Sequence, residues 1–301
     1  MIAALPRNVI AEAYIAACRL EVRTLKPGNV HIFADGHRMT VADFDHSANA
    51  SAPFIADPAL SVGDRILNAV EATFAAVATN TNLGIVLLSA PLAAAAEHGT
   101  KSASFADSLH AVLAALDHND ARAVYKAIAM ANPAGLGSDK AGDVRAEPPA
   151  DWTLLDAMRA AAPRDMIAQE YATGFATILE NARTLTQDIA SGAAPEDALA
   201  VLFLRRLSER PDTHIIRKHG PALAHRVMTR AAETFATLDL QSASGIAKPE
   251  NRLRLLELDA ELKSWRANPG SLADLMCASA FASMLIDAIG DCITAEPNNP
   301  N

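Results

Sequence analysis

Residues 79–99, TNTNLGIVLLSAPLAAAAEHG, change abruptly from a polar cluster to a long apolar run. We expect the run to form a buried helix that ends near Gly99. Alanine loses no side-chain entropy in a helix, so a chain rich in alanine favours closely packed helices. The whole chain shares this composition: 50% of its 301 residues are hydrophobic and only 5% are aromatic. The predicted fold class is therefore all-α.

Helical periodicity recurs outward from this run in both directions. Apolar residues return at helical spacing from Pro6 to about Thr24, where Pro27-Gly28 ends the pattern. Thr40 or Ser47 is expected to cap the next helix. The other helices are predicted over residues 61–79, 105–116, 119–130, 154–162, 165–191, 195–209, 220–238, 251–267 and 271–289. Without an internal repeat or a linker, we expect one bundle-like helical domain over residues 1–294 and a frayed tail over 295–301.

Charge and cysteine content exclude several classes of partner. The formal net charge of −9 gives no overall positive field to attract nucleic acid or an anionic membrane. The three cysteines, Cys18, Cys277 and Cys292, lie far apart and are expected to be reduced thiols in the core. No apolar run is expected to span a membrane, which takes about 20 residues, so the expected location is the cytoplasm.

Five polar clusters share one design, because each lies at a helix end, beside a glycine or proline and next to an apolar helix. They are residues 21–30 (EVRTLKPGNV), 79–84 (TNTNLG), 135–145 (GLGSDKAGDVR), 212–220 (DTHIIRKHG) and 268–274 (NPGSLAD). Helix ends on the same side of a bundle can meet at one pocket. We therefore predict a single site at converging helix ends.

The two clusters nearest the C-terminus each allow a binding role and a structural role. The cations of residues 212–220 suit phosphate or carboxylate oxygens, but cations are also favoured at any helix C-terminus. Asp274 follows a flexible Pro-Gly at a helix start, where it could hold a divalent cation. Ordinary capping by Ser271 or Asn268 explains the same pattern.

The two clusters nearest the N-terminus also allow both a binding role and a structural role. Asn80 and Asn82 could bind a ribose or a base edge, or merely cap the following helix. Glu21 and Lys26 could form a surface ion pair, which is the usual arrangement for such residues. The chain has neither GxxxxGK[ST] nor a GxGxxG after a strand, so a bound nucleotide is not held by a P-loop or a Rossmann turn.

In order along the chain, these clusters resemble motifs of the ATP:dephospho-CoA triphosphoribosyl transferase family, which includes the prosthetic-group synthases of citrate lyase and malonate decarboxylase. EVRTLKPGNV resembles the E-x-x-x-x-K-P-G-L-V motif through Glu21, Lys26, Pro27 and Gly28. ATNTNLG is similar to N-T-H/N-x-G through Asn80, Thr81, Asn82 and Gly84. DTHIIRKHG resembles D-T-N-V-L-x-R-x-G through Asp212, Thr213, Ile215, Arg217 and Gly220. NPGSLADL is similar to S-P-G-G-S-A-D-L through Pro269, Gly270, Ala273, Asp274 and Leu275.

The resemblance implies an all-helical enzyme that joins C1 of the ATP ribose to the 2′-hydroxyl of dephospho-CoA and expels adenine. ATP and a small cofactor precursor are then the expected partners, with Mg²⁺ as the expected cofactor. Separately from the resemblance, the alanine-rich helical surface suggests a homodimer. The implied catalytic or metal-binding carboxylates are Glu21, Asp212 and Asp274. The implied substrate-binding residues are Lys26, Gly28, His37, Asn80, Asn82, His214, Arg217, Lys218 and Gly270.

The chain departs from the family pattern on the acceptor side. The family's G-A-H-x-D-M-D loop reads GHRMTVADFDHSA here, so Gly36 and His37 match but the D-M-D element does not. The R-G-E-A segment is interpreted as reduced to DVRAEPP, and Ser271-Leu272 replaces Gly-Ser in the last motif. These changes suggest that ATP is still used but that the acceptor differs, for example a pterin or furan precursor of one-carbon metabolism. A separate alternative is a noncatalytic helical binding protein whose polar clusters are caps.

Overall fold

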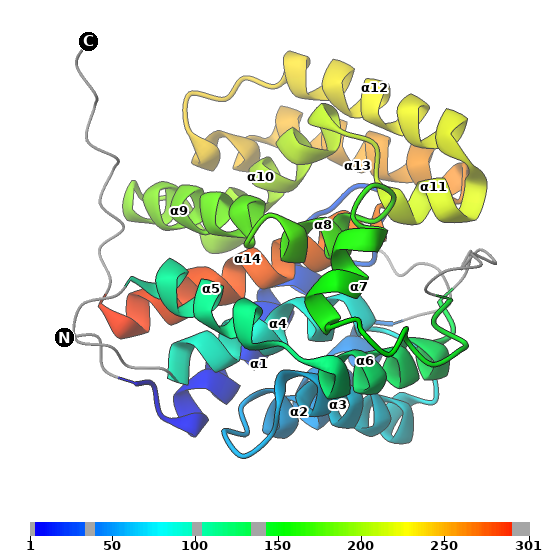
Figure 1. Ribbon diagram of the computed structural model, residues 1–301. Coiled ribbons are helices and arrows are strands. Elements are labelled where there is room, and N and C mark those ends of the chain that lie inside the picture. Colours follow the sequence, from blue (N-terminus) through cyan, green and yellow to red (C-terminus); the bar gives the residue numbers. More distant parts are fainter. Residues whose placement is uncertain (1–3, 34–39, 98–103, 134–142, 291–301) are drawn as a thin grey trace, which may run out of the picture.

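The computed structural model describes residues 4–33, 40–97, 104–133 and 143–290 (Figure 1). Within those ranges the chain forms fourteen α-helices, one short 3-10 helix and no β-strand, which confirms the all-α prediction. The elements are α1 Arg7–Arg23, α2 Val41–Ile55, α3 Val62–Val77, α4 Leu83–Glu97, α5 Phe105–Ala115, α6 His118–Ala131, α7 Leu154–Ala161, α8 Met166–Ala172, α9 Ala176–Ala190, α10 Pro195–Glu209, α11 Thr213–His219, α12 Pro221–Thr237, η1 Ala243–Ala247, α13 Pro249–Ser264 and α14 Gly270–Ile289.

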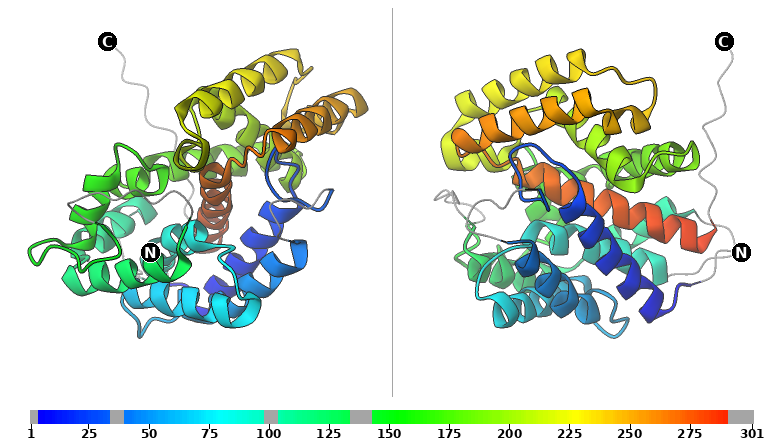
Figure 2. Two further views of the ribbon diagram at one scale, coloured as in Figure 1. Left: turned by 90° about the vertical axis from the view of Figure 1, so that its right-hand side faces the viewer. Right: turned by 180° about the vertical axis from the view of Figure 1, so that it is seen from behind.

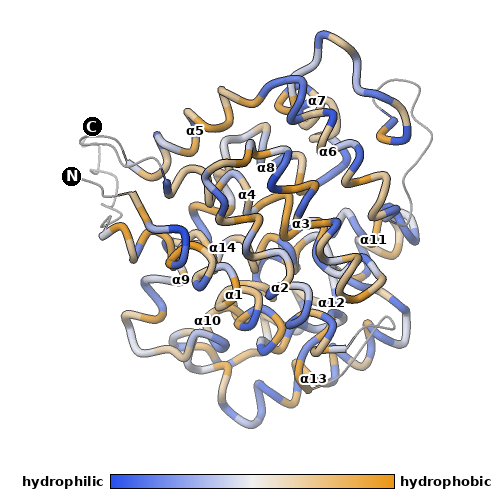
Figure 3. The backbone as a smooth tube through the Cα atoms, turned by 90° about the horizontal axis from the view of Figure 1, so that it is seen from below, coloured by the Kyte–Doolittle hydropathy of each residue, from blue (hydrophilic) through white to orange (hydrophobic). Residues whose placement is uncertain are grey.

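Helix α14 is the central helix around which the others pack. It packs against α1, α4, α9 and α10. The left view of Figure 2 is nearly along the axis of α14 and shows the other helices around it. Helices α2, α3 and α6 lie on one side of it, and α10, α12 and α13 on the other (Figure 1). Hydrophilic stretches follow mainly the outer turns and connections (Figure 3).

The composition of α14 corrects one expectation from the sequence. Its 20 residues are long and apolar enough to cross a membrane, with a mean hydropathy of 1.7 over the most apolar window, whereas no such run was expected. In this structure 72% of that window is buried inside the protein, as expected for a core helix. Its many alanines and serines let the neighbouring helices approach closely.

The alanine-rich run that suggested the fold forms α4, as predicted. Every residue from Ile85 to Ala96 is buried, and the helix packs against α3, α5 and α14. Since α4 is apolar on all sides, it is stable only when it is buried in the interior of the protein. Its first turn, at Leu83-Gly84, is the part that faces the pocket described below.

The single helix predicted over residues 165–191 is wrong, because the structure divides it into α8 and α9. Gly174 and Phe175 both adopt left-handed backbone angles, with φ of 67° and 62°, and such residues end a helix. The Phe175 ring is fully buried and contacts Tyr171, with the ring centroids 5.2 Å apart. Burial of this ring offsets the cost of the unusual backbone.

Two helix starts give the local detail of capping. Thr40 caps α2 in a reciprocal capping box with Asp43, so one of the two predicted caps is confirmed, while Ser47 lies inside the helix. Residues 212–220 form a short helix of their own, α11, with Asp212 as its N-cap and its cations in the last turn. The position at a helix C-terminus, one of the two alternatives for these cations, is therefore confirmed. The Sγ atoms of Cys18 and Cys277 lie 3.7 Å apart and both thiols are free and buried. Cys292 and the predicted tail lie outside the described residues.

Candidate active site

A pocket of about 990 Å³ opens where the ends of several helices meet. This is at the upper end of the range of roughly 300–1,000 Å³ for small-molecule sites. Each of the five polar clusters supplies at least one lining residue, represented by Glu21, Asn80, Asp143, Arg217 and Asp274. The predicted convergence of the clusters is therefore confirmed for their described residues.

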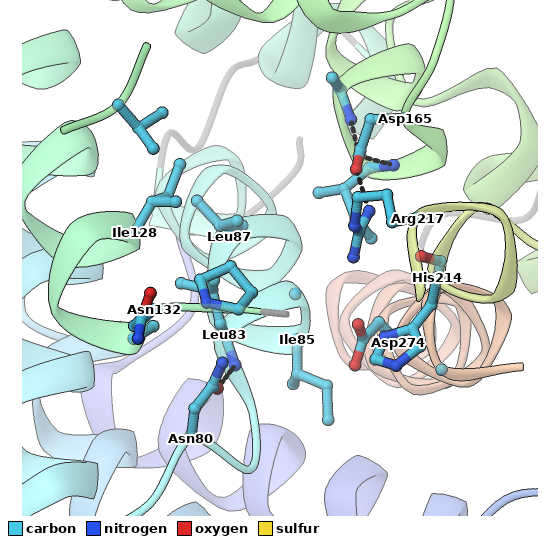
Figure 4. Close-up of a pocket in the computed structure, with 18 of the residues that line it drawn as sticks. Asn80, Leu83, Ile85, Leu87, Ile128, Asn132, Asp165, His214, Arg217 and Asp274 are labelled. Carbon is cyan, nitrogen blue, oxygen red and sulfur yellow. Dashed lines mark hydrogen bonds and ion pairs between the residues drawn. The ribbon is translucent and has the colours of Figure 1, made fainter. Parts of the chain in front are cut away.

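The pocket has two chemically different walls (Figure 4). One wall comes from α4 and α6 and presents aliphatic side chains together with two asparagines, Asn80 and Asn132. The opposite wall comes from α8, α11 and α14 and presents charged and polar groups. Those labelled in Figure 4 are Asp165, His214, Arg217 and Asp274. A ligand that fits between them has an apolar part and a strongly polar part.

Asp274 lies in the first turn of α14 and faces the start of α4. A Cβ atom added to Gly84 would lie only 2.1 Å from Asp274 Oδ2, so the carboxylate occupies the space that a side chain would need. Burial raises the pKa of Asp274 well above its ordinary value, and the charges of Glu21 and Asp212 raise it further. Asp274 therefore holds a proton readily unless a cation joins it.

Glu21 is at the pocket and is paired with a lysine behind it. Lys26 Nζ lies 3.0 Å from Glu21 Oε1 and donates a hydrogen bond of 2.8 Å to the Val30 carbonyl. The two side chains are 0% and 3% exposed, so this is a buried ion pair and the surface alternative is excluded. Burial raises the pKa of Glu21 and lowers the pKa of Lys26, while the attraction between them opposes both shifts.

Asp165 forms an ion pair with Arg217 and so holds it in the charged wall. Asp165 was not among the site residues predicted from the sequence. Arg217 Nη1 lies 2.5 Å from Asp165 Oδ2. The other carboxylate oxygen, Oδ1, accepts backbone hydrogen bonds from Ile167 and Ala168 at the start of α8. Arg217 Nε is buried and has no hydrogen-bond partner among the described residues. An aspartate directly before a helical pattern was visible as a cap, but nothing in the sequence showed that it would meet Arg217.

Residues 7–292 match the family model of the ATP:dephospho-CoA triphosphoribosyl transferases, CitG. The chain belongs to this family. It is 31% identical over 118 residues to a protein assigned as a 2-(5''-triphosphoribosyl)-3'-dephosphocoenzyme-A synthase in Stutzerimonas stutzeri (strain A1501). That match covers 38% of this chain and 38% of the relative's own length.

A solved structure supports the fold of this family. The chain resembles the crystal structure of a protein assigned as a triphosphoribosyl-dephospho-CoA synthase from Archaeoglobus fulgidus, with a TM-score of 0.60 and 24% sequence identity. The likeness covers 79% of this chain and 96% of the other. The resemblance seen in the sequence motifs and the all-helical fold that it implied are both confirmed.

Not every motif residue of the transferase family reaches the pocket in this chain. Of the residues proposed from the sequence, Glu21, Asn80, His214, Arg217, Gly270 and Asp274 line it, and Lys26, Gly28, Asn82, Asp212 and Lys218 do not. His37 lies outside the described residues.

Three of the proposed residues that do not line the pocket, Asp212, Gly28 and Lys26, make structural contacts within the fold. Both oxygens of Asp212 are used, since Oδ1 accepts from the Ile215 amide and Oδ2 from the Leu272 amide, which ties α11 to α14. The Gly28 amide donates to Asp259 Oδ1 at 2.8 Å. Lys26 acts on Glu21, as described above, and Lys218 is exposed on α11. These residues do not line the pocket, and their direct contact with substrate stays a prediction.

The three carboxylates expected to bind a metal are not grouped together in the described part of the chain. Among the described residues, no three His, Cys, Asp or Glu side chains are grouped so that they could hold a metal ion. Asp212 is committed to backbone amides, which leaves Glu21 and Asp274 as the members of the set that face the pocket. A metal at this site would need further oxygens from a ligand.

Proposed function

We propose that this protein transfers the triphosphoribosyl group of ATP to an acceptor hydroxyl, with dephospho-CoA as the default acceptor, and releases adenine. The observation that carries the proposal is that Glu21, Asn80, Arg217 and Asp274, from four separate motifs of the family, meet at one pocket. Caps alone do not require such a meeting, so the noncatalytic alternative is the weaker one.

The reaction breaks the bond between C1 of the ribose and adenine and forms a bond from C1 to the acceptor oxygen. The hydroxyl loses a proton and the departing adenine gains one, so no further reactant is needed. Positive charge develops near C1, and a carboxylate there stabilises it. Glu21 and Asp274 suit these roles because both carboxyl groups reach the pocket and burial raises the pKa of each above its ordinary value.

Mg²⁺ suits the pocket as a companion of the triphosphate. The described lining residues include the carboxylates of Glu21, Asp143, Asp165 and Asp274 but only two arginines, Arg164 and Arg217. A polyphosphate entering such a site needs added positive charge. Mg²⁺ usually binds through one or two carboxylates together with substrate phosphates, and Glu21 and Asp274 would hold it here. When bound, it would neutralise and orient the phosphates.

The decisive experiment is chromatographic. The protein is incubated with ATP, Mg²⁺ and dephospho-CoA, and the mixture is examined for free adenine and for a product heavier by the triphosphoribosyl group. Both species are expected. ATP binding without either species would reject dephospho-CoA as acceptor, and absence of ATP binding would reject the proposal as a whole.

A second candidate is the same donor reaction on a different acceptor, such as a pterin or furan precursor. One observation favours it: the D-M-D element of the family's acceptor-side loop has no counterpart in this chain. In the segment after His37, Thr40 and Asp43 are engaged in the capping box of α2, and Phe44 lines the pocket. Replacing dephospho-CoA by such precursors in the same assay, with adenine release as the signal, tests it.

Asp274 gives the site-specific test. We expect Asp274→Asn to abolish Mg²⁺-dependent ATP binding, because the amide cannot supply the negative charge that the metal needs. Titration calorimetry with and without Mg²⁺ measures this. Unchanged ATP affinity would remove Asp274 from the site.

A homodimer and a cytoplasmic location stay predictions, and light scattering after gel filtration tests the first.

A further inference from the structure

We propose that Asn80 and Asn132, on the apolar wall of the pocket, recognise the edge of an adenine ring. Asn132 belongs to none of the five polar clusters and was not among the residues predicted from the sequence. The inference rests on the proposed function, because both ATP and dephospho-CoA carry adenine.

The wall between these asparagines is suited to a flat ring. Leu83, Leu87 and Ile128 lie on this side of the pocket (Figure 4), and the pocket is also lined by Phe74, Tyr125 and Leu154. A purine is apolar on its two faces and polar along its edge. Its faces can therefore pack on this wall while its edge needs hydrogen-bonding groups nearby.

Asparagine amides match the edge of adenine in particular. Adenine presents the donor N6 amino group beside acceptor nitrogens, and an asparagine amide offers one acceptor and one donor group side by side. Figure 4 places Asn80 and Asn132 on the same side of the pocket, across from Asp274, His214 and Arg217. A ring bound at the asparagines directs its ribose toward the charged wall.

Both amides have hydrogen-bonding capacity left for a ligand. Asn80 Oδ1 accepts the Leu83 amide at 3.2 Å, which caps the start of α4 and leaves the amino group of the side chain available. Asn132 is exposed and lines the pocket, and its side chain makes no hydrogen bond to another described residue. Its backbone has φ of 40° and ψ of 54° at the C-cap of α6.

The C-cap position supplies a competing explanation that must be separated experimentally. Asparagine and glycine are the residues that most readily adopt left-handed backbone angles, so Asn132 could be present only to end α6. Asn132→Gly keeps that backbone and removes only the amide. Asn80→Asp keeps the oxygen that accepts the Leu83 amide and removes the donor. Because it also adds a negative charge that repels any triphosphate, its effect is read as the ratio of ATP affinity to inosine triphosphate affinity.

The test compares the binding of ATP, inosine triphosphate and dephospho-CoA by titration calorimetry, all with Mg²⁺. Inosine triphosphate has an oxygen in place of the N6 amino group and a proton on N1, so it lacks both the donor at position 6 and the acceptor at N1 that adenine presents. Asn132→Gly is expected to weaken ATP binding about 10-fold and to leave inosine triphosphate binding nearly unchanged. Asn80→Asp, which loses the donor that would reach N1, is expected to lower the ratio of ATP affinity to inosine triphosphate affinity about 10-fold. Asn119→Ala is the control, because Asn119 is exposed on the same helix as Asn132 but does not line the pocket.

The outcomes separate the source of the adenine and the failure of each proposal. If the loss appears with dephospho-CoA and not with ATP, the wall binds the adenine of the acceptor and the inference stands. If neither affinity changes relative to Asn119→Ala, the inference is overturned. A protein that prefers ATP to inosine triphosphate through these residues, yet releases no adenine, keeps the inference and rejects the proposed transfer to dephospho-CoA.

Discussion

At the scale of single residues, the ion pair of Glu21 and Lys26 shows how a buried charge can be built into a site. Lys26 lies beyond the end of α1 and folds back so that its ammonium group meets Glu21 behind the pocket. Burying the two charges costs desolvation energy, and only their mutual attraction offsets that cost. Each charge is therefore tolerated in the core because its partner is there. Lys26 is thus a positioning residue for Glu21 and has no contact with the pocket itself.

Removal of one partner should be costly. We expect Lys26→Met to lower the free energy of unfolding by about 3–5 kcal/mol, because it leaves a carboxylate buried without its cation. The double variant Glu21→Gln/Lys26→Met should recover part of that loss. Urea unfolding at pH 7 measures both. Lys218→Met, at an exposed position, serves as control and should change stability by less than about 0.5 kcal/mol. A Lys26→Met variant as stable as this control would contradict the account.

Residue types in the motifs were readable from the sequence, but their burial was not. Spacing identified Glu21, Arg217 and Asp274 as residues with chemistry, and all three line the pocket. The same motifs also pointed to Asp212, whose two oxygens are occupied by backbone amides. A motif shows which residues are kept together in a family pattern. It does not show whether a side chain faces a ligand or supports a neighbour that does.

At the scale of elements, the crossing of α4 and α14 positions the carboxylate of Asp274. The two helices pack together in the core, and Gly84 is the point where the first turn of α4 meets Asp274. Because there is no room for a Cβ atom, the position of one helix fixes the position of the other. The N-T-N-x-G motif therefore carries a packing role at its glycine as well as any binding role at its asparagines.

Gly84→Ala tests this crossing. We expect a loss of about 1–3 kcal/mol in the free energy of unfolding, together with weaker ATP binding, because either α4 or Asp274 must shift. Urea unfolding and calorimetry measure the two effects. Gly192→Ala is the control: it has open space around it but a φ of +95°, so it should cost backbone energy without changing ATP affinity. ATP affinity equal to that of the control would show that Asp274 does not depend on this contact.

The junction of α11 and α14 should make stability depend on pH through Asp212. Burial raises the pKa of Asp212 from 3.8 to about 6. Between these pH values the folded state holds a proton that the unfolded state has released, so stability falls as pH rises through the window and levels off above about 6. We expect a contribution on the order of 2–3 kcal/mol to this fall. Urea midpoints from pH 4 to 7 should show a flatter profile in Asp212→Asn, and an unchanged slope would contradict the assignment.

Most helices followed from periodicity, and the exceptions have physical causes. The break between α8 and α9 depends on Phe175, whose left-handed backbone is offset by burial of its ring, and burial is a property of the folded chain. Gly174 was the local signal of that break. Helix α11 was not predicted as a separate helix, because its seven residues are too few to show a clear period.

At the scale of the whole molecule, the pocket joins parts of the chain that are far apart in sequence. Its lining extends from Glu21 near the end of α1 to Asp274 in the first turn of α14, and includes residues of α3, α4, α6, α7, α8 and α11. Sequence reasoning could predict that helix ends converge. Which wall each would form depends on how the helices pack around α14, and no local pattern encodes that packing.

A ligand that touches both walls should therefore stabilise both sides of the molecule at once. At a free concentration 100 times its dissociation constant, Mg²⁺-ATP should raise the free energy of unfolding by about 2.7 kcal/mol. Hydrogen exchange should slow in α4 and α6 as well as in α11 and α14, because residues of all four line the pocket. The exposed outer helix α13 contributes no lining residue and is the internal control. Protection confined to α11 and α14 would mean that ATP contacts only the charged wall, and the adenine would then have to lie elsewhere.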